Sequence, residues 1–243
     1  MDKLAVLLGL RAYAEKVAHQ AGYYLDHSRW HASGAGKGST LWHHGTRHSF
    51  DQFSDPLDLT HSASMDWNAQ LGVHFTNRPG VAGAFANGVY GDEAARKVEG
   101  RVISARLKIH TPAYYDREIP MKQDASRVAL HAGLLDEALS RKDYTQERYF
   151  QEFRDREGLN NEQAMDLWAV NVYHDHMGHI APMFEVPPRL AFHKQMARAF
   201  KDHLETQGHD GVVYENTREG GLGAIAFHPE QIEVAARKKA RPA

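Results

Sequence analysis

Four stretches of this sequence hold residues whose types and spacing could do chemistry. Residues 34–39 are rich in glycine, and residues 43–46 read His-His-Gly-Thr. Three histidines fall within residues 174–179. Two carboxylates, Glu215 and Glu219, stand in a glycine-containing segment near the C-terminus. These stretches point to phosphate binding, metal binding or acid–base work, and spacing and context separate the three.

The glycine-rich stretch resembles the phosphate-binding loop of nucleotide kinases, in which backbone amides and a lysine hold phosphates. That loop needs a glycine five positions before Gly36-Lys37, where this chain has His31. It must also follow a buried strand and open a helix. Residues 23–33 are too polar for such a strand, and residues 40–46 are typical of a strand rather than a helix. We interpret the stretch as a flexible connector and keep a kinase that uses Lys37 as a lesser hypothesis.

The histidine cluster has residue types that metal sites favour. On a helix, however, His176 and His179 share one face and His174 does not. A helix that ends near Gly178 would also place these imidazoles close to its C-terminal dipole, which explains them without a metal. We therefore predict no metal site and leave the role of the three histidines open.

The bulk composition narrows the classes of function. The chain has 243 residues, a net charge of -2 and no cysteine. Its length suits one large domain, or a core domain with an elaboration. The charge gives no overall basic field for nucleic acid or anionic membranes, although a nucleic-acid partner stays open. No apolar run reaches the length of a membrane span, and residues 3–26 fit an amphipathic helix better than a signal peptide.

Three separated segments carry the strongest functional signal. They are LWHHGT at 41–46, followed soon by FDQF; LGVHFTNRPGVAGAFA at 71–86; and GHDGVVYENTREGGLGAIAFHPEQI at 208–232. In this order, with VISARLKIHTP between the last two, they resemble the ADP-ribosyltransferase superfamily. The resemblance is to the branch of diphtheria-type toxins, poly(ADP-ribose) polymerases and the transferase domains of phage and mobile-element polyvalent proteins. It covers residues 41–110 and 208–232.

The resemblance implies NAD as a substrate and assigns roles to residues of the three segments. His44 would hydrogen-bond a ribose hydroxyl, and the backbone of Gly45 would pair with the nicotinamide carboxamide, where no side chain is wanted. Relatives have Tyr where this chain has His74 and a second aromatic at Phe85, and the two sandwich the nicotinamide ring. The expected NAD-binding residues are His44, Gly45, Thr46, His74, Phe75, Thr76, Phe85, Tyr214 and Asn216.

The catalytic carboxylate is assigned by the same resemblance. In the polymerases it lies just before the apolar run of the last strand, where this chain has Gly223. The polyvalent-protein domains instead carry Tyr-x-Asn-x-x-Glu-Gly, and the matching residues here are Tyr214, Asn216, Glu219 and Gly220. We therefore expect Glu219 to act with His44 in catalysis, with Glu215 as the second candidate. The carboxylate would bind the nicotinamide-ribose 2′-hydroxyl and stabilise an oxocarbenium-like transition state.

These roles lead to a functional hypothesis, an NAD-dependent mono-ADP-ribosyltransferase. It would pass ADP-ribose to a macromolecular acceptor, for which we favour a protein over nucleic acid. Relatives that are toxins, injected effectors or phage proteins imply a cytoplasmic protein or one delivered into a host cell. Two alternatives remain, an NAD glycohydrolase on the same site and an inactive protein-binding module of the same fold. The second is supported by the missing Glu at position 223 and the missing Tyr at position 74.

The elements that must position these residues follow from hydrophobic periodicity. Strands are predicted at 39–45, 71–76, 101–109, 211–214 and 223–227, and helices at 79–87, 124–140, 145–158, 161–177 and 189–207. Pro187-Pro188 is expected to separate the last two helices. This order predicts an α+β fold, and the resemblance implies an ADP-ribosyltransferase-like split β-sheet core with an N-terminal helix and a helical insertion.

The domain organisation is expected to follow the same division. Residues 1–38 would form the N-terminal helix and the connector. Residues 39–232 would form the ADP-ribosyltransferase-like domain, including a helical block at about 121–207. Residues 233–243 are predicted to be a frayed C-terminal tail.

Overall fold

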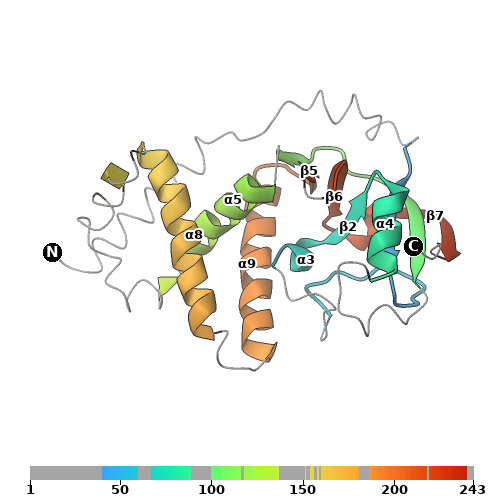
Figure 1. Cartoon of the computed structure of the whole chain (residues 1–243), viewed down its shortest axis with the longest axis horizontal. Helices are drawn as coiled ribbons and strands as arrows, with labels where there is room; N and C mark the ends of the chain where they lie inside the picture. Colours follow the sequence, from blue (N-terminus) through green and yellow to red (C-terminus); the bar gives the residue numbers. More distant parts are fainter. Residues whose placement is uncertain are drawn as a thin grey trace. The chain divides into compact units, whose positions relative to one another are not determined.

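The structure is a computed structural model of the whole chain (Figure 1). It describes residues 40–59, 67–88, 100–115, 118–136, 151, 154–155, 158, 160–180, 186–217 and 219–239. The described parts fall into two compact units. A helical unit lies within residues 64–70 and 119–203, and a sheet unit lies within residues 24–63, 71–118 and 204–243.

The sheet unit is built on one seven-stranded sheet with the order β4-β5-β6-β2-β1-β3-β7. The strands are β1 (Trp42–Thr46), β2 (Val73–Thr76), β3 (Arg101–Leu107), β4 (Ala113–Tyr115), β5 (Gly211–Glu215), β6 (Leu222–Ala226) and β7 (Ile232–Lys239). Neighbouring strands pair antiparallel except β4 and β5, which are parallel. The helical block therefore lies in the crossover between β4 and β5, since parallel neighbours need a long connection.

The sheet divides in the middle. β1 and β2 pair through a single residue pair, His43 opposite Thr76, whereas β1 pairs with β3 along its whole length. β2 in turn pairs with β6 along its whole length. Two continuous sets of strands are thus joined at one point, which is the split sheet that the sequence comparison implies.

One face of the sheet carries the main apolar core. Its members come from six strands and the segment after β3, and they are Trp42, Val73, Phe75, Ala105, Leu107, Ile109, Tyr114, Val213, Ala224 and Ala226. The alternation of β3 explains how it contributes, because Ile103, Ala105 and Leu107 are buried while Arg106 is exposed. Residues two apart on a strand share a face, so this pattern half-buries the strand.

Helix α4 (Pro79–Ala86) packs on the other face of the sheet, across β1 and its neighbours (Figure 1). It approaches β1 very closely, because a β-carbon on Gly45 would lie 2.0 Å from the carbonyl oxygen of Ala82. At Gly100, just before β3, a β-carbon would lie 2.0 Å from the carbonyl oxygen of Ala86. Glycine at these two positions lets the helix backbone rest directly on the sheet.

In its described residues the helical unit contains three longer helices, which are α5 (Glu118–His131), α8 (Asn161–Ile180) and α9 (Val186–Thr206) (Figure 1). The short helix α3 (Trp67–Leu71) joins them through Trp67, whose ring lies 5.9 Å from that of Phe200 on α9. Tyr173 on α8 packs against Phe192 on α9 at 6.3 Å between ring centroids. Among the helices in the described residues, none is long and apolar enough to cross a membrane.

The α+β prediction is confirmed, and the boundaries of several elements are corrected. α5 runs from Glu118 to His131 rather than over 124–140, and α8 continues through Gly178 to Ile180. Pro187-Pro188 stands inside the first turn of α9 rather than before it. A proline is tolerated there because first-turn amides have no partner within the helix.

Some elements were not expected, and some predictions cannot be compared with the structure. The helix α3 and the three-residue strand β4 are absent from the sequence prediction. The predicted N-terminal helix and the connector with Lys37 lie outside the described residues, as does most of the predicted helix 145–158.

The predicted C-terminal tail is wrong over most of its length. Strand β7 pairs antiparallel with β3, from Ile232 opposite Leu107 to Lys239 opposite Arg101. The physical reason is pairing with a distant strand rather than a local pattern. Ile232 and Ala236 are partly buried and the residues between them are exposed, so burial shows no alternation along β7, and the ladder with β3 holds this part of the chain as an edge strand.

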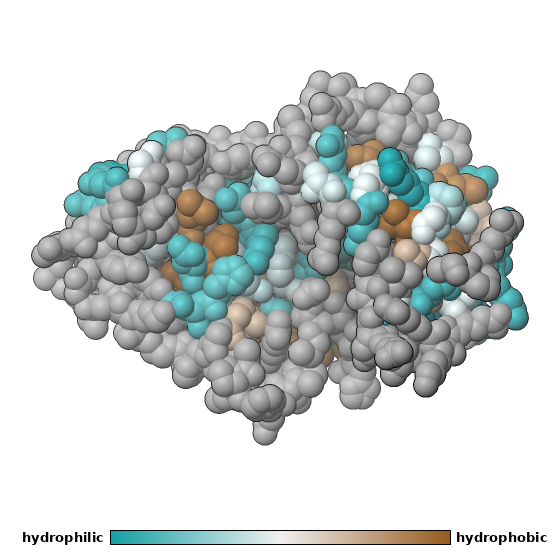
Figure 2. Space-filling view, in the orientation of Figure 1, coloured by the Kyte–Doolittle hydropathy of each residue, from teal (hydrophilic) through white to brown (hydrophobic). Residues whose placement is uncertain are grey.

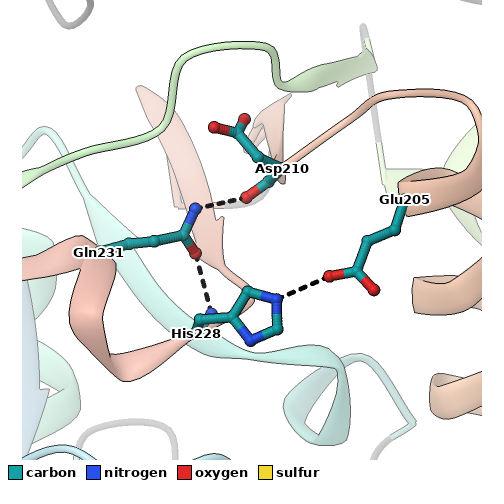
Figure 3. Close-up of polar contacts among 4 residues, drawn as sticks. All are labelled: Glu205, Asp210, His228 and Gln231. Carbon is teal, nitrogen blue, oxygen red and sulfur yellow. Dashed lines mark hydrogen bonds and ion pairs between the residues drawn. The ribbon is translucent and has the colours of Figure 1, made fainter.

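A polar network closes the end of the sheet from which β5 begins (Figure 3). The Gln231 side chain donates to the carbonyl oxygen of Asp210 at 2.7 Å and accepts from the backbone N–H of His228 at 2.8 Å. The His228 ring in turn lies 2.7 Å from a carboxylate oxygen of Glu205, in the last turn of α9. The start of β5 is thereby attached to the turn that follows β6.

Candidate active site

His44 occupies the gap between β1 and β2. Its Nδ1 atom lies 2.8 Å from the carbonyl oxygen of His74 on β2. Past the single pair of His43 and Thr76, a regular ladder would give that carbonyl a backbone partner from β1. The side chain of His44 bonds it instead, so the imidazole fills the space that the strands leave as they separate.

The protonation state of His44 follows from these contacts. A carbonyl oxygen only accepts, so Nδ1 carries the hydrogen in this bond. Burial lowers the pKa of His44, an effect that outweighs the opposite influence of the bond to His74. The ring is therefore neutral near pH 7, and Nε2 carries a lone pair. Within the described residues, no hydrogen bond to Nε2 is formed, so this atom can accept one from a ligand hydroxyl.

Three phenylalanine rings enclose His44. Phe53 lies 5.3 Å away between ring centroids, Phe75 lies 5.7 Å away and Phe50 lies 6.4 Å away. Phe50 and Phe53 belong to the loop after β1, which the sequence analysis quoted without giving it a role. This enclosure removes part of the water around the imidazole, which is partly buried, and this desolvation is the main physical cause of its lowered pKa.

The loop that carries Phe50 and Phe53 is held by the far edge of the sheet. Arg237 on β7 donates to the carbonyl oxygens of Phe50 and Asp51, and its guanidinium lies 5.7 Å from the centre of the Phe50 ring. Arg101 on β3 donates to Ser49 at 2.9 Å. Strand β7, which the sequence did not predict, therefore holds the aromatic loop that covers His44.

Gly45 has a structural reason to be glycine that the sequence analysis did not foresee. The expected reason was room for a carboxamide, but a side chain at position 45 would clash with the backbone of α4. A β-carbon would lie 2.0 Å from the Ala82 carbonyl oxygen and 2.9 Å from the Ala86 nitrogen. The requirement for glycine thus holds without any ligand, and pairing with a carboxamide stays a prediction.

The other expected residues of β1 and β2 have distinct surroundings. Phe75 is buried in the apolar core. The hydroxyl groups of the two threonines hold turns, since Thr46 accepts from the backbone of His48 at 3.1 Å and Thr76 accepts from the backbone of Arg78 at 3.2 Å. His74 contributes its carbonyl oxygen to His44.

Phe85 on α4 is the expected aromatic that is open to solvent. Its side chain is 42% exposed, while Ala82 and Ala86 on the same helix are buried. The face of the molecule drawn in Figure 2 mixes hydrophilic and hydrophobic residues rather than showing one uniform apolar surface. An exposed phenylalanine of this kind offers a ring face for stacking.

Glu219 lies in the loop that connects β5 and β6, and Asn216 holds it. The Asn216 side chain donates to the Glu219 carboxylate and accepts from the Glu219 backbone N–H at 3.0 Å. The loop then turns through Gly220 and Gly221, whose φ angles are 81° and 89°. Only glycine adopts such angles without strain, so these two residues define the path of the loop after Glu219.

Glu215 points to the face of the sheet that carries the apolar core, as His44 does. It follows Val213 by two residues on β5, and Val213 belongs to the apolar core. Its carboxylate accepts a hydrogen bond from the hydroxyl group of Tyr114 at 3.1 Å. The second candidate carboxylate therefore already has a structural partner on the face opposite α4.

Tyr214 covers Gly223. The two residues pair across β5 and β6, and a β-carbon on Gly223 would lie 2.4 Å from Cζ and 2.8 Å from the hydroxyl oxygen of Tyr214. The phenol ring thus fills the space that a side chain at position 223 would enter. The polymerase-type position for the carboxylate is closed by Tyr214, which agrees with the choice of a carboxylate in the loop.

A row of residues, polar except for one glycine, crosses five neighbouring strands on the face that α4 partly covers. In order they are Ser104, His43, Thr76, Gly223 and Tyr214, each opposite the next. His43 bonds Ser104 at 3.0 Å through Nδ1, and burial lowers the pKa of His43. The sequence analysis missed His43 because two adjacent histidines on a strand point to opposite faces, and only the second one fits the family motif.

The expected residues form two groups. One is His44 with His74 and Phe75, which contact its imidazole, and the other is the Glu219 loop next to Asn77 and Arg78. The Asn77 side chain accepts from the backbone N–H of Leu222 at 2.9 Å, which joins this loop to the end of β2. No hydrogen bond or ring contact in the described residues joins His44 to Glu219, and β2 and β6 lie between β1 and this loop in the sheet.

The histidine cluster on α8 is divided between different surroundings. His174 Nε2 lies 3.2 Å from the ammonium nitrogen of Lys122, and burial together with this positive charge lowers the pKa of His174. His176 is buried with its ring 4.4 Å from that of Phe192, and the side chain of His179 lies outside the described residues. In the part of the chain that the structure describes, no group of three or more suitable side chains could hold a metal ion.

The split sheet, with a histidine in its gap and a carboxylate on the loop before β6, defines an ADP-ribosyltransferase-like domain. Residues 36–241 match the family model described as ADP-ribosyltransferase in polyvalent proteins. The chain belongs to this family, because the match covers nearly all of it. Neither the curated proteins nor the solved structures contain a significant match.

Proposed function

We propose that this member of the ADP-ribosyltransferase family is an NAD-dependent mono-ADP-ribosyltransferase. It would cleave the bond between nicotinamide and ribose and transfer ADP-ribose to a macromolecular acceptor, for which we favour a protein. The observation that carries the proposal is the neutral His44, fixed by His74 and lacking a hydrogen-bond partner at Nε2 within the described residues. A lone pair held in a fixed direction suits a ribose hydroxyl, which can donate to it.

In this proposal the chain supplies binding, orientation and negative charge. His44 accepts a hydrogen bond from a ribose hydroxyl of NAD, and the exposed ring of Phe85 stacks on the nicotinamide. The NAD-binding gap is lined in this proposal by five further residues, through their backbone or their side chains: Gly45, Thr46, His74, Phe75 and Thr76. Tyr214, on β5, and Asn216, directly after it, bind NAD next to Glu219. NAD spans the separation between His44 and Glu219, which make no direct contact.

Glu219 is the proposed catalytic carboxylate. As nicotinamide leaves with the electron pair of the C1′–N bond, positive charge develops on the ribose. A carboxylate that already accepts a hydrogen bond from Asn216 is oriented before the reaction, so it stabilises that charge without reorganising. Glu215 is less suited, because its carboxylate already accepts a hydrogen bond from Tyr114.

The test is nicotinamide release from NAD by the purified full-length chain, with and without a protein lysate as the source of acceptors. Glu219→Gln removes the charge and keeps the shape, and we expect release to fall about 100-fold or more. Glu215→Gln is the matched control and should change release less than about threefold. A wild-type chain that neither binds NAD nor releases nicotinamide would favour the inactive protein-binding module. Release that is independent of any acceptor would favour an NAD glycohydrolase.

The biological setting is part of the proposal. A family found in polyvalent proteins is consistent with an origin in phages or other mobile elements, and a toxin or effector acting on a host protein fits that setting. This setting rests on the name of the family and on the resemblance described above.

A further inference from the structure

Arg78 is an exposed cation at the edge of the Glu219 loop, and the proposed function gives it no role. It connects β2 to α4 and is the N-cap residue of that helix, with φ -113° and ψ 110°. Its carbonyl oxygen accepts from the backbone N–H groups of Val81 at 3.1 Å and Ala82 at 3.3 Å. The backbone of Arg78 is therefore fixed at the start of α4, while its side chain extends toward solvent.

The side chain of Arg78 lies against the two glycines that follow Glu219. A β-carbon on Gly220 would lie 2.9 Å from a terminal guanidinium nitrogen of Arg78. On Gly221 it would lie 3.0 Å from both Cδ and Nε of the same side chain. Because these two glycines have no side chains, the Arg78 side chain can lie along the loop. Its guanidinium ends next to Gly220, the residue that follows the proposed catalytic carboxylate.

The charge of Arg78 is not neutralised in the part of the chain that the structure describes. Its guanidinium forms no hydrogen bond or ion pair there, and the carboxylate of Glu219, in the adjoining loop, is bound by Asn216. By comparison, Arg106 is also exposed but pairs with Glu233 at 3.4 Å. An arginine whose side chain is oriented by packing, and which has no anionic partner in the described residues, is suited to bind a negatively charged ligand.

We propose that Arg78 recognises the acceptor and that the acceptor group is the carboxylate of an Asp or Glu side chain in a protein. This proposal rests on the proposed function and adds the chemical class of the acceptor. A planar guanidinium binds a carboxylate through two parallel hydrogen bonds, which orients a carboxylate oxygen toward the ribose as well as attracting it. An arginine acceptor would meet a like charge at this position.

The position of Arg78 favours the acceptor over the phosphates of NAD. His44, which holds a ribose in our proposal, lies on β1, while Arg78 leaves β2 toward the loop between β5 and β6. The sheet order places β2 and β6 together on one side of the gap and β1 on the other. A dinucleotide that extends from Glu219 toward His44 therefore leads away from Arg78. The net charge of -2 also gives no field to collect nucleic acid, so a protein carboxylate is favoured over a nucleic-acid phosphate.

The transfer step is balanced without a further reagent. The C1′–N bond breaks and its electron pair leaves with nicotinamide, which departs as a neutral molecule. A carboxylate oxygen donates an electron pair to C1′ and forms an ester. The positive charge of the nicotinamide ring and the negative charge of the acceptor cancel, so no base is needed to deprotonate the nucleophile. The site needs only to hold the anion beside Glu219 against the repulsion of that carboxylate, which is the task assigned to Arg78.

The test uses the full-length chain, NAD and three peptides that differ only in a central Glu, Ser or Arg. Peptide-bound ADP-ribose is measured by mass spectrometry and divided by the nicotinamide released in the same reaction. We expect the Glu peptide to be labelled at least tenfold more than the other two, with a product that neutral hydroxylamine cleaves, as it does esters. In Arg78→Ala this ratio should fall at least tenfold, Arg78→Lys should recover part of it, and the control Arg106→Ala should retain it.

Several outcomes would overturn the proposal. Preferred labelling of the Ser or Arg peptide, or of a phosphorylated oligonucleotide added in parallel, would assign a different acceptor. A parallel loss of nicotinamide release and labelling in Arg78→Ala would place this arginine on NAD instead. Nicotinamide release without labelling of the Glu peptide would remove this proposal alone, whereas a wild-type chain that releases no nicotinamide would remove the proposed function with it.

Discussion

The imidazole of His44 shows how a single residue takes its chemical state from its surroundings. The enclosure by Phe50, Phe53 and Phe75 lowers its pKa, and the carbonyl oxygen of His74 selects the tautomer. Together they leave one nitrogen as an acceptor. The sequence motif predicts which histidine to consider, but the neutral form and the identity of the accepting atom follow from contacts with other segments.

The first prediction concerns the pH dependence of stability through His44. Because its pKa is lowered in the folded chain, the unfolded chain binds the proton more readily, and folding stability is lost as pH falls below about 6.5. The loss due to this residue reaches up to about 1.4 kcal/mol at pH 5.5. His44→Gln should therefore reduce the difference in unfolding free energy between pH 7.5 and pH 5.5, measured by urea denaturation.

His48→Gln is the control, since it removes an exposed imidazole from the same region without opening the aromatic enclosure. It should keep the wild-type difference between the two pH values. An equal reduction in both variants would mean that the acid sensitivity attributed to His44 arises elsewhere.

A second residue-scale prediction tests why position 45 is glycine. Gly45→Ala places a methyl group against the backbone of α4 and should reduce the free energy of unfolding by about 3 kcal/mol. Gly83→Ala, in the middle of α4 with open space around it, should instead stabilise the chain by about 0.5–1 kcal/mol. Urea denaturation of both variants measures the contrast. A tolerated Gly45→Ala would show that α4 does not rest on β1 as described.

At the scale of elements, β7 and α4 shape the gap between β1 and β2 through different contacts. β7 carries Arg237, which holds the loop of Phe50 and Phe53 over His44. α4 lies on Gly45 and presents Phe85 outward. Neither element contains the expected catalytic residues, yet each decides which atoms near the gap are exposed.

The prediction at this scale concerns Arg237. Arg237→Ala removes two charge-assisted hydrogen bonds to the backbone of the loop, and we expect hydrogen exchange of residues 47–53 to become about tenfold faster. Lys238→Ala is the matched control, because the neighbouring residue on an edge strand points to the other face. Unchanged exchange in Arg237→Ala would mean that the aromatic contacts alone hold the loop.

At the scale of the whole molecule, the chain leaves the sheet unit after β4 and returns at β5. Asp210 marks the return. Its carboxylate accepts from the backbone N–H groups of His110 at 2.7 Å and Thr111 at 2.8 Å, just before β4, and its carbonyl oxygen accepts from Gln231 (Figure 3). One residue thus connects the start of β5 to two other segments, the residues before β4 and the turn before β7.

The corresponding prediction is that Asp210→Ala destabilises the sheet unit. The loss of two hydrogen bonds to a carboxylate at a partly exposed site should lower the free energy of unfolding by about 2 kcal/mol. Asp58→Ala removes an exposed carboxylate that forms no hydrogen bond in the described residues, and it should change stability by less than about 0.5 kcal/mol. Equal effects in chemical denaturation would refute the closing role of Asp210.

Much of the fold could be predicted from the sequence where local pattern and structure coincide. The strands around His44, His74 and Ala224 were predicted at the correct places, because their alternation or apolar runs reflect burial on a sheet. β4 was missed because three residues are too short for any period to be visible, and its pairing with β5 depends on contacts about a hundred positions away. β7 was missed because its basic residues suggested a frayed end. Exposed basic residues such as Arg237 are equally compatible with a strand at the edge of a sheet.

By itself, the sequence determined the family of this protein, the α+β class and the residues to consider, since motifs and periodicity are local properties of a chain. Tertiary structure alone decided which of these residues have which chemistry. It placed Tyr214 over Gly223, bound Glu215 to Tyr114, enclosed His44 and laid Arg78 beside Gly220. Each of these facts joins segments far apart in the chain, and burial, charge and hydrogen bonding act through space rather than along the sequence.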